Sequence, residues 1–209
     1  MTLDEKQFVL SVNALGLDDK PDTGAHLLRA YTEPGRHYHD RHVAKCLSWL
    51  DRMRHLAERP DEIALAIWFH DAVYDPKRSD NEEKSADWAR EFLRSASAPA
   101  DVTHRIVEMI LATKTHDVSD GDGALMMDID LSILGTDGKS FDVFEQDVLR
   151  EYEWLPEEKY REGRAAVLQE FLNRSPIFQV REMRDLLESQ AKENLARRIK
   201  ELQSGKPTS

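Results

Sequence analysis

Histidine and aspartate residues lie at three places where the surrounding pattern predicts a buried position. His70 and Asp71 follow directly on an unbroken apolar run, and His42 lies on the apolar face of a predicted helix. Asp130 falls within the apolar segment 126–134, where helical spacing turns it towards the core. Burying an imidazole or a carboxylate is costly unless a partner satisfies it. A divalent cation would satisfy all four side chains, since it binds imidazole nitrogen and carboxylate oxygen.

Hydrogen bonds alone are the alternative explanation for each of these residues. His70 and Asp71 would then form a structural pair, and His42 would be a satisfied core or capping residue. Asp130 would pair with an arginine. The cation is favoured because the candidates form an ordered set of His, His-Asp and Asp, each on its own predicted helix. The set therefore predicts a metal centre.

Further polar residues near these positions are candidates for substrate binding and catalysis. Arg36 lies on a loop beside a glycine, and its forked guanidinium suits a phosphate. Lys114 and His116 lie at the end of a predicted helix and are candidates to bind a substrate phosphate. Alternatively, Lys114 is only a basic residue of the last turn, where the helix dipole favours a positive charge. Glu82 faces inward and would orient a ligand histidine or accept from a metal-bound water, unless it only caps its helix. Cys46 is expected to be a small buried apolar side chain.

Predicted helices must position all these residues. Apolar residues recur with helical spacing over about 3–15, a short segment to 31, 40–57, 60–73, 80–96, 101–115, 124–134, 140–155, 156–173 and 178–203. The helix over 60–73 is apolar on every side, which predicts a central, buried position. Asp61, Ser79 with Glu82, and Ser140 are the predicted N-terminal caps. A loop is expected around Pro21 and Gly24, and the tail 204–209 is expected to fray.

The bulk composition limits the classes of protein. With no convincing strand, repeat or low-complexity block, we expect an all-α, single-domain bundle over 1–209, with a core at about 26–135 and C-terminal helices at about 140–203. The net charge of −11 argues against a DNA-binding surface, although not against a nucleotide substrate. One cysteine excludes an internal disulfide. No apolar run is long enough to span a membrane and no secretory signal is evident, so a cytoplasmic location is expected. The long final helix would offer a homodimer face.

The ordered motifs resemble a known family. They are similar to those of the HD-domain metal-dependent phosphohydrolases, and specifically of a bacterial branch described as predicted phosphohydrolases. The resemblance covers nearly the whole chain and rests on Tyr31-Thr32-Glu33-Pro34 with Arg36, Tyr38-His39 with His42, Trp68-Phe69-His70-Asp71 with Tyr74-Asp75, Asn81-Glu82 with Ser85-Ala86, Ala112-Thr113-Lys114 with His116, Asp128 through Gly135, and Gly163-Arg164. It implies an HD-type helical bundle whose metal ligands are His42, His70, Asp71 and Asp130.

One spacing departs from the resemblance. Relatives usually place four positions between the Tyr-His histidine and the ligand histidine, whereas His39 and His42 are three apart. In the related cyclic-nucleotide phosphodiesterases, the earlier histidine is the proton donor. We therefore expect His42 to bind the metal and His39 to act in catalysis, and a deletion in this region would instead make His39 the ligand.

The expected chemistry is hydrolysis of a phosphate ester or phosphoanhydride in a small metabolite, with nucleotides among the candidates. A water activated by one divalent ion (Mn, Fe, Co, Ni, Zn or Mg) would attack phosphorus, and His39, Asp71 and Glu82 are the expected catalytic residues. A second ion is compatible with His116. One alternative is a di-iron oxygenase, which would need His104 as well as His116 as ligands. The other is a non-catalytic sensor that binds a nucleotide on the same fold.

Overall fold

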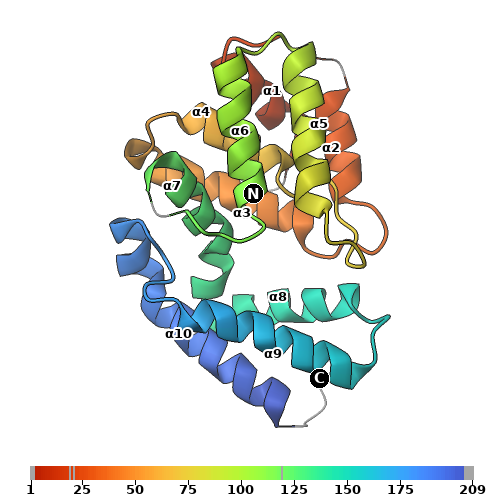
Figure 1. Ribbon diagram of the computed structural model, residues 1–209, viewed down its shortest axis with the longest axis vertical. Helices are drawn as coiled ribbons and strands as arrows, with labels where there is room; N and C mark the ends of the chain where they lie inside the picture. Colours follow the sequence, from red (N-terminus) through yellow and green to blue (C-terminus); the bar gives the residue numbers. More distant parts are fainter. Residues whose placement is uncertain (1–2, 19, 21, 119, 205–209) are drawn as a thin grey trace. The chain divides into compact units, whose positions relative to one another are not determined.

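The described residues of the computed structural model are 3–18, 20, 22–118 and 120–204. They form helices joined by turns and loops, with no β-strand among them (Figure 1). The all-α prediction is therefore confirmed. Pro21, assigned above to a loop, and residues 205–209 of the predicted frayed tail lie outside the described residues.

The helices fall into two compact units, Met1–Asp130 and Leu131–Ser209. The first unit contains α1 (Glu5–Ala14), α2 (Thr23–Tyr31), α3 (His39–Met53), η1 (Arg54–Leu56), α4 (Pro60–Phe69), α5 (Asn81–Ser95), α6 (Ala100–Ala112) and α7 (Gly121–Asp130). The second contains η2 (Leu131–Gly135), α8 (Gly138–Glu151), α9 (Glu157–Asn173) and α10 (Arg181–Gln203). The division lies just before the predicted boundary between core and C-terminal helices. A single domain over 1–209 stays a prediction.

Helix α4 is the centre of the first unit. All its residues from Glu62 to Phe69 are buried, and it packs against α1, α3, α5, α6 and α7. Phe8 of α1 and Phe92 of α5 pack their rings against Phe69, with ring centroids 6.1 and 5.4 Å apart. A helix covered on every side can be apolar on every side, because none of its faces meets water. The prediction of a central, buried helix is confirmed.

Helix α4 ends at Phe69, four residues earlier than the prediction of Val73. The amide of His70 still bonds the carbonyl of Ala66, at 2.9 Å, and the helical bonding then stops. The His-Asp doublet consequently lies at the point where the chain emerges from the core.

The predicted N-terminal caps differ in detail from those observed. Asp61 lies inside the first turn of α4, which begins at Pro60, and forms an ion pair with Arg54. Ser140 receives a cap instead of providing one, since Asp137 accepts bonds from its amide (3.1 Å) and its hydroxyl (2.6 Å). The predicted capping box of Ser79 and Glu82 is not formed; Asp80 is the residue before α5.

Gly24 was predicted in a loop and lies in the first turn of α2. It is buried, and a Cβ atom there would come within 2.9 Å of Glu5 Cγ and 3.1 Å of the Phe8 ring. A glycine at this point therefore permits α2 to approach α1 closely. The pattern of a glycine after Pro21 suggested a turn, and the close helix contact that requires it is not visible in sequence.

The second unit is held together by α10, which packs against α9, η2 and α8. Glu145 of α8 is buried and bonds two arginines, Arg164 of α9 at 2.5 Å and Arg198 of α10 at 3.1 Å. Two guanidinium groups supply the hydrogen bonds that a buried carboxylate needs. Arg164 of the Gly163-Arg164 motif thus bonds a buried carboxylate of this unit.

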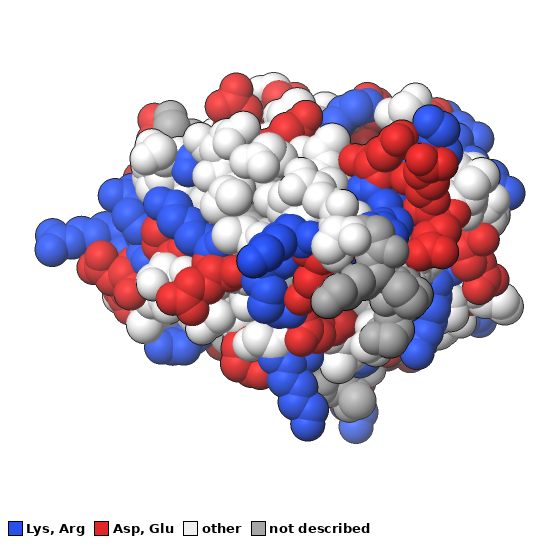
Figure 2. All heavy atoms as spheres, turned by 90° about the horizontal axis from the view of Figure 1, so that it is seen from below, with Lys and Arg blue, Asp and Glu red and all other residues white. Residues whose placement is uncertain are grey.

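The surface carries charges of both signs. Figure 2 shows one face on which acidic and basic side chains are interspersed with uncharged areas. The acidic side chains on that face do not form one continuous acidic patch. Among the described residues, every helix is either too short or too polar to cross a bilayer.

Candidate metal centre

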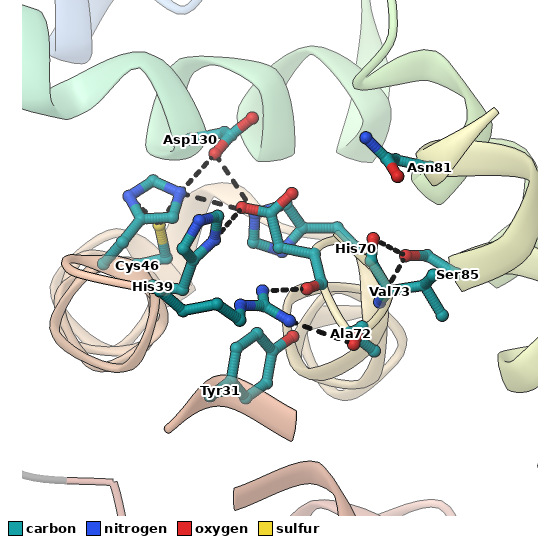
Figure 3. A network of polar contacts seen from close by, with 12 residues as sticks. Tyr31, His39, Cys46, His70, Ala72, Val73, Asn81, Ser85 and Asp130 are labelled. Carbon is teal, nitrogen blue, oxygen red and sulfur yellow. Dashed lines mark hydrogen bonds and ion pairs between the residues drawn. The ribbon is translucent and has the colours of Figure 1, made fainter. Parts of the chain in front are cut away.

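Three predicted ligands from separate elements meet in the first unit. His42 comes from the first turns of α3, His70 follows α4 directly, and Asp130 ends α7. The Nε2 atoms of His42 and His70 face each other at 3.3 Å, and Asp130 Oδ1 lies 2.7 Å from the first and 3.4 Å from the second (Figure 3). Two imidazole nitrogens this close repel each other through their lone pairs unless a proton or a cation lies between them.

Asp71 completes the set. Its Oδ2 atom lies 3.7 Å from His70 Nε2, and the ligand atoms of His42, His70 and Asp71 are all within 4.8 Å of one another. With metal–ligand bonds of about 2.0–2.2 Å, neighbouring ligand atoms in octahedral or tetrahedral sites are about 2.9–3.5 Å apart. The observed separations scatter around this range. The ligand atoms of His42, His70 and Asp71 are thus close enough for one divalent cation, and Asp130 belongs to a second such group, with His42 and Cys46.

The orientation of His70 is set by its other nitrogen. Nδ1 lies 2.9 Å from the carbonyl oxygen of Ile67, one turn earlier in α4, and a carbonyl can only accept. Nδ1 therefore carries a proton and donates it to Ile67, which directs Nε2 at His42 and Asp130. Histidine ligands in metal proteins are usually oriented in this way.

A positive charge on His70 offsets the negative charges of Asp71 and Asp130. Burial by itself would lower the pKa of His70, but the carboxylates of Asp71 and Asp130 outweigh burial and raise this pKa to about 9. Burial opposes ionisation of the two carboxyl groups as well. The charge of His70 and hydrogen bonds from neighbouring histidines nevertheless hold the pKa of each below the ordinary aspartate value. A divalent cation would compete with the proton of His70 for these carboxylates.

Cys46 lies one turn after His42, as the spacing predicted. It is buried, and its Sγ atom is 3.7 Å from His42 Nε2 and 3.8 Å from the carbonyl oxygen of Ile129. Burial and the nearby charges of Asp130 and Asp71 raise the pKa of the Cys46 thiol. A neutral, buried thiol packs as a small apolar group and is a weak metal ligand.

His116 reaches the second oxygen of Asp130. Its Nε2 atom lies 2.7 Å from Asp130 Oδ2, and its backbone has a positive φ of 51°. A left-handed residue after α6 turns the chain back, which brings this imidazole to α7. His116 was predicted to bind substrate or a second ion, and the structure places it against a predicted ligand of the first ion.

Arg36 lies under the doublet. Its guanidinium donates to the main-chain carbonyl of Asp71 and, at 3.2 Å, to that of Ala72. The same group lies over the rings of Tyr31 and Tyr74, at 5.0 and 5.6 Å from their centroids. Two of its donors are therefore engaged by the protein's own backbone. The structure supports a role in holding residues 71–72, and gives no support to the predicted phosphate clamp.

Two further residues hold the chain after the doublet, and sequence reasoning gave them no role. Ser85 accepts from the amide of Val73 at 3.0 Å (Figure 3). Asn81 accepts from the amide of Asp75 at 3.0 Å and donates to its carbonyl at 2.9 Å. Because residues 71–75 are not helical, their backbone groups need such partners. In the sequence, Asn81 and Ser85 stood out only as members of the family motif, and the motif did not indicate that they bond this backbone.

Glu82 and Lys114 are not brought into the cluster. Glu82 is partly exposed in the first turn of α5, and its charge acts on Lys114. Lys114 pairs with Glu83 and donates to the carbonyl of Ser79 at 2.7 Å. These contacts attach the loop before α5 to the end of α6. The predicted catalytic and phosphate-binding roles of the two residues find no contact to support them.

Comparisons with protein-family models, with curated proteins and with solved structures gave no match. The functional argument therefore depends on the residues and geometry described above.

Proposed function

We propose that this protein is a metal-dependent phosphohydrolase whose divalent ion is bound by His42, His70, Asp71 and Asp130. The proposal is carried by the two facing Nε2 atoms at 3.3 Å, with Asp130 Oδ1 close to both. When bound, a divalent cation lowers the pKa of a water nucleophile and neutralises charge on phosphoryl oxygens. The phosphoryl specificity is taken from the sequence resemblance.

The protein's own residues prepare the centre for this reaction. His70 is fixed by Ile67, Asp130 is held through its second oxygen by His116, and the backbone of Asp71 is held by Arg36. Preorganised ligands need little rearrangement when the cation and substrate bind. The Asp71 side chain is 26% exposed, so a substrate can approach the centre from that side.

The charges around the centre indicate how a phosphate would be neutralised. Arg36 and Lys114, the two cations expected to meet it, are engaged by carbonyl oxygens and by Glu83. The bound cation would therefore be the main counter-charge for the substrate. A small phosphate ester or a nucleotide fits this proposal.

The di-iron alternative loses one of its required ligands. The side chain of His104 is 73% exposed and lies 3.9 Å from Glu108 on the same helix. Of the two extra histidines that alternative needs, only His116 contacts the cluster. The geometry consequently favours hydrolysis over oxygen activation.

The test is a metal and substrate screen. Chelated protein receives Mn²⁺, Co²⁺, Ni²⁺ or Mg²⁺ in turn, and p-nitrophenyl phosphate and nucleoside phosphates are assayed for released phosphate. We expect one stoichiometric ion per chain and hydrolysis that depends on it. Asp71→Asn and Asp130→Asn should each weaken metal binding by at least about 100-fold, since each removes a charged ligand, and should abolish turnover.

His104→Ala is the matched control, because it removes an exposed imidazole outside the cluster. Its metal content and activity should equal those of the unchanged protein. Full activity in Asp71→Asn would refute the proposal. Tight nucleotide binding without product under every metal would identify a sensor instead.

A further inference from the structure

His39 lies outside the group of facing ligand atoms but touches one of its members. It begins α3, is fully buried, and its Nδ1 atom is 3.1 Å from Asp71 Oδ2 (Figure 3). An aspartate carboxylate can only accept a hydrogen bond, whereas an imidazole N–H can donate one. His39 Nδ1 therefore donates to Asp71.

Two aromatic rings fix the plane of this imidazole. Tyr38 stacks on it with ring centroids 4.2 Å apart and planes 24° apart, and Tyr74 covers it at 4.3 Å with a tilt of 51°. A ring held between two others cannot turn without displacing them. The two rings thus fix the position of the donor, His39 Nδ1, opposite the acceptor, Asp71 Oδ2.

The spacing in α3 explains how one helix turn serves two purposes. His39 and His42 are three positions apart, so both point to the same side of α3. His42 directs Nε2 towards His70, whereas His39 directs Nδ1 towards Asp71. The three-residue spacing that departs from the resemblance thus delivers one ligand and one donor that holds another ligand.

A proton donor would need to approach the leaving oxygen of the substrate within hydrogen-bond distance. Full burial between Tyr38 and Tyr74 prevents direct contact between His39 and a substrate. We infer that His39 is a positioning residue that holds the Asp71 carboxylate towards the cation by its Nδ1–H bond, and does not protonate the leaving group. This inference rests on the proposed metal centre.

The test distinguishes three roles of His39: its hydrogen bond to Asp71, the packing of its ring between the tyrosines, and proton donation to the leaving group. His39→Asn places an amide N–H two bonds from Cβ, where Nδ1 lies, whereas His39→Gln places it one carbon further, where Nε2 lies. His39→Phe keeps a ring between the tyrosines and has no donor. Mn²⁺ affinity is measured by calorimetry, the Co²⁺ site by visible absorption, and folding of the metal-free protein by circular dichroism.

We expect His39→Asn to bind Mn²⁺ within about threefold of the unchanged protein and to keep its Co²⁺ spectrum. His39→Gln and His39→Phe should bind Mn²⁺ about 10- to 100-fold more weakly, as is usual when a group that supports a ligand is lost. Hydrolysis should follow metal occupancy in every variant, and His39→Asn with saturating metal should retain most of its kcat.

Two results would overturn the inference. Unchanged Mn²⁺ affinity in His39→Phe would show that the bond to Asp71 does not matter. Loss of kcat in fully metal-loaded His39→Asn would show that His39 is a proton donor. Either result leaves the metal centre standing, whereas a failure of the unchanged protein to bind any of the tested metals rejects the proposed function itself.

Discussion

At the scale of single residues, the centre depends on side chains that hold other side chains. The predicted ligands Asp71 and Asp130 are each bonded by a histidine outside the group of facing nitrogens. Arg36 supports the backbone at the doublet through two carbonyl bonds. Such supporting groups often matter as much to a metal site as the ligands do.

Arg36→Lys should therefore weaken both the fold and the site. Lysine presents one compact ammonium and cannot bridge the carbonyls of Asp71 and Ala72 in the planar fork geometry. We expect the free energy of unfolding to fall by about 1–3 kcal/mol and Mn²⁺ affinity to fall with it. Urea unfolding and metal titration measure the two effects. Arg29→Lys, on the exposed face of α2, is the control and should change neither; equal behaviour of the two variants would contradict this role of Arg36.

At the scale of elements, close approach between helices decides where glycine is required. A Cβ atom at Gly135 would lie 2.6 Å from Leu187 Cβ and 2.8 Å from the Leu187 carbonyl oxygen. The backbone of α10 cannot move aside without disturbing its packing on η2. Gly163 of α9 has nothing within 4 Å of the same hypothetical atom. The two glycines thus form a natural comparison.

Gly135→Ala should lower the free energy of unfolding by about 1–3 kcal/mol, the usual cost of forcing a methyl group into a packed contact. Gly163→Ala should raise it by up to about 1 kcal/mol, because alanine favours a helix interior. Chemical denaturation followed by circular dichroism compares the variants. A Gly135→Ala protein as stable as the unchanged one would show that η2 and α10 are less closely packed than the structure indicates.

At the scale of the whole molecule, every proposed ligand belongs to the unit Met1–Asp130. The cation would join α3, α7 and the end of α4, which are distant in sequence. A ligand that binds only the folded state stabilises it by RT ln(1 + [L]/Kd), about 2.7 kcal/mol at a hundredfold excess over Kd.

Adding Mn²⁺ should consequently slow amide hydrogen exchange in α3, α4 and α7, measured by mass spectrometry on chelated and reloaded protein. The same addition to Asp71→Asn should produce little change, since that variant lacks a charged ligand. Equal protection by Mn²⁺ in both proteins would place the bound metal elsewhere in the molecule.

The amino-acid sequence by itself determined the helical class, the central position of α4 and the inward direction of His42 and Asp130. These properties follow from apolar periodicity, which reports the face of a helix that water does not reach. The apolar run also placed His70 and Asp71 at the C-terminal end of the buried helix, although α4 ends four residues earlier than predicted.

Only the tertiary structure decided which side chains meet. Helical spacing gives the face of a residue but not the partner opposite it, because that partner comes from packing between distant segments. For this reason Arg36 was predicted to meet a phosphate and is found on the carbonyls of Asp71 and Ala72. The contacts of His39 and His42 depend on packing in the same way: packing of α3 brings His42 Nε2 to His70 and His39 Nδ1 to Asp71 Oδ2.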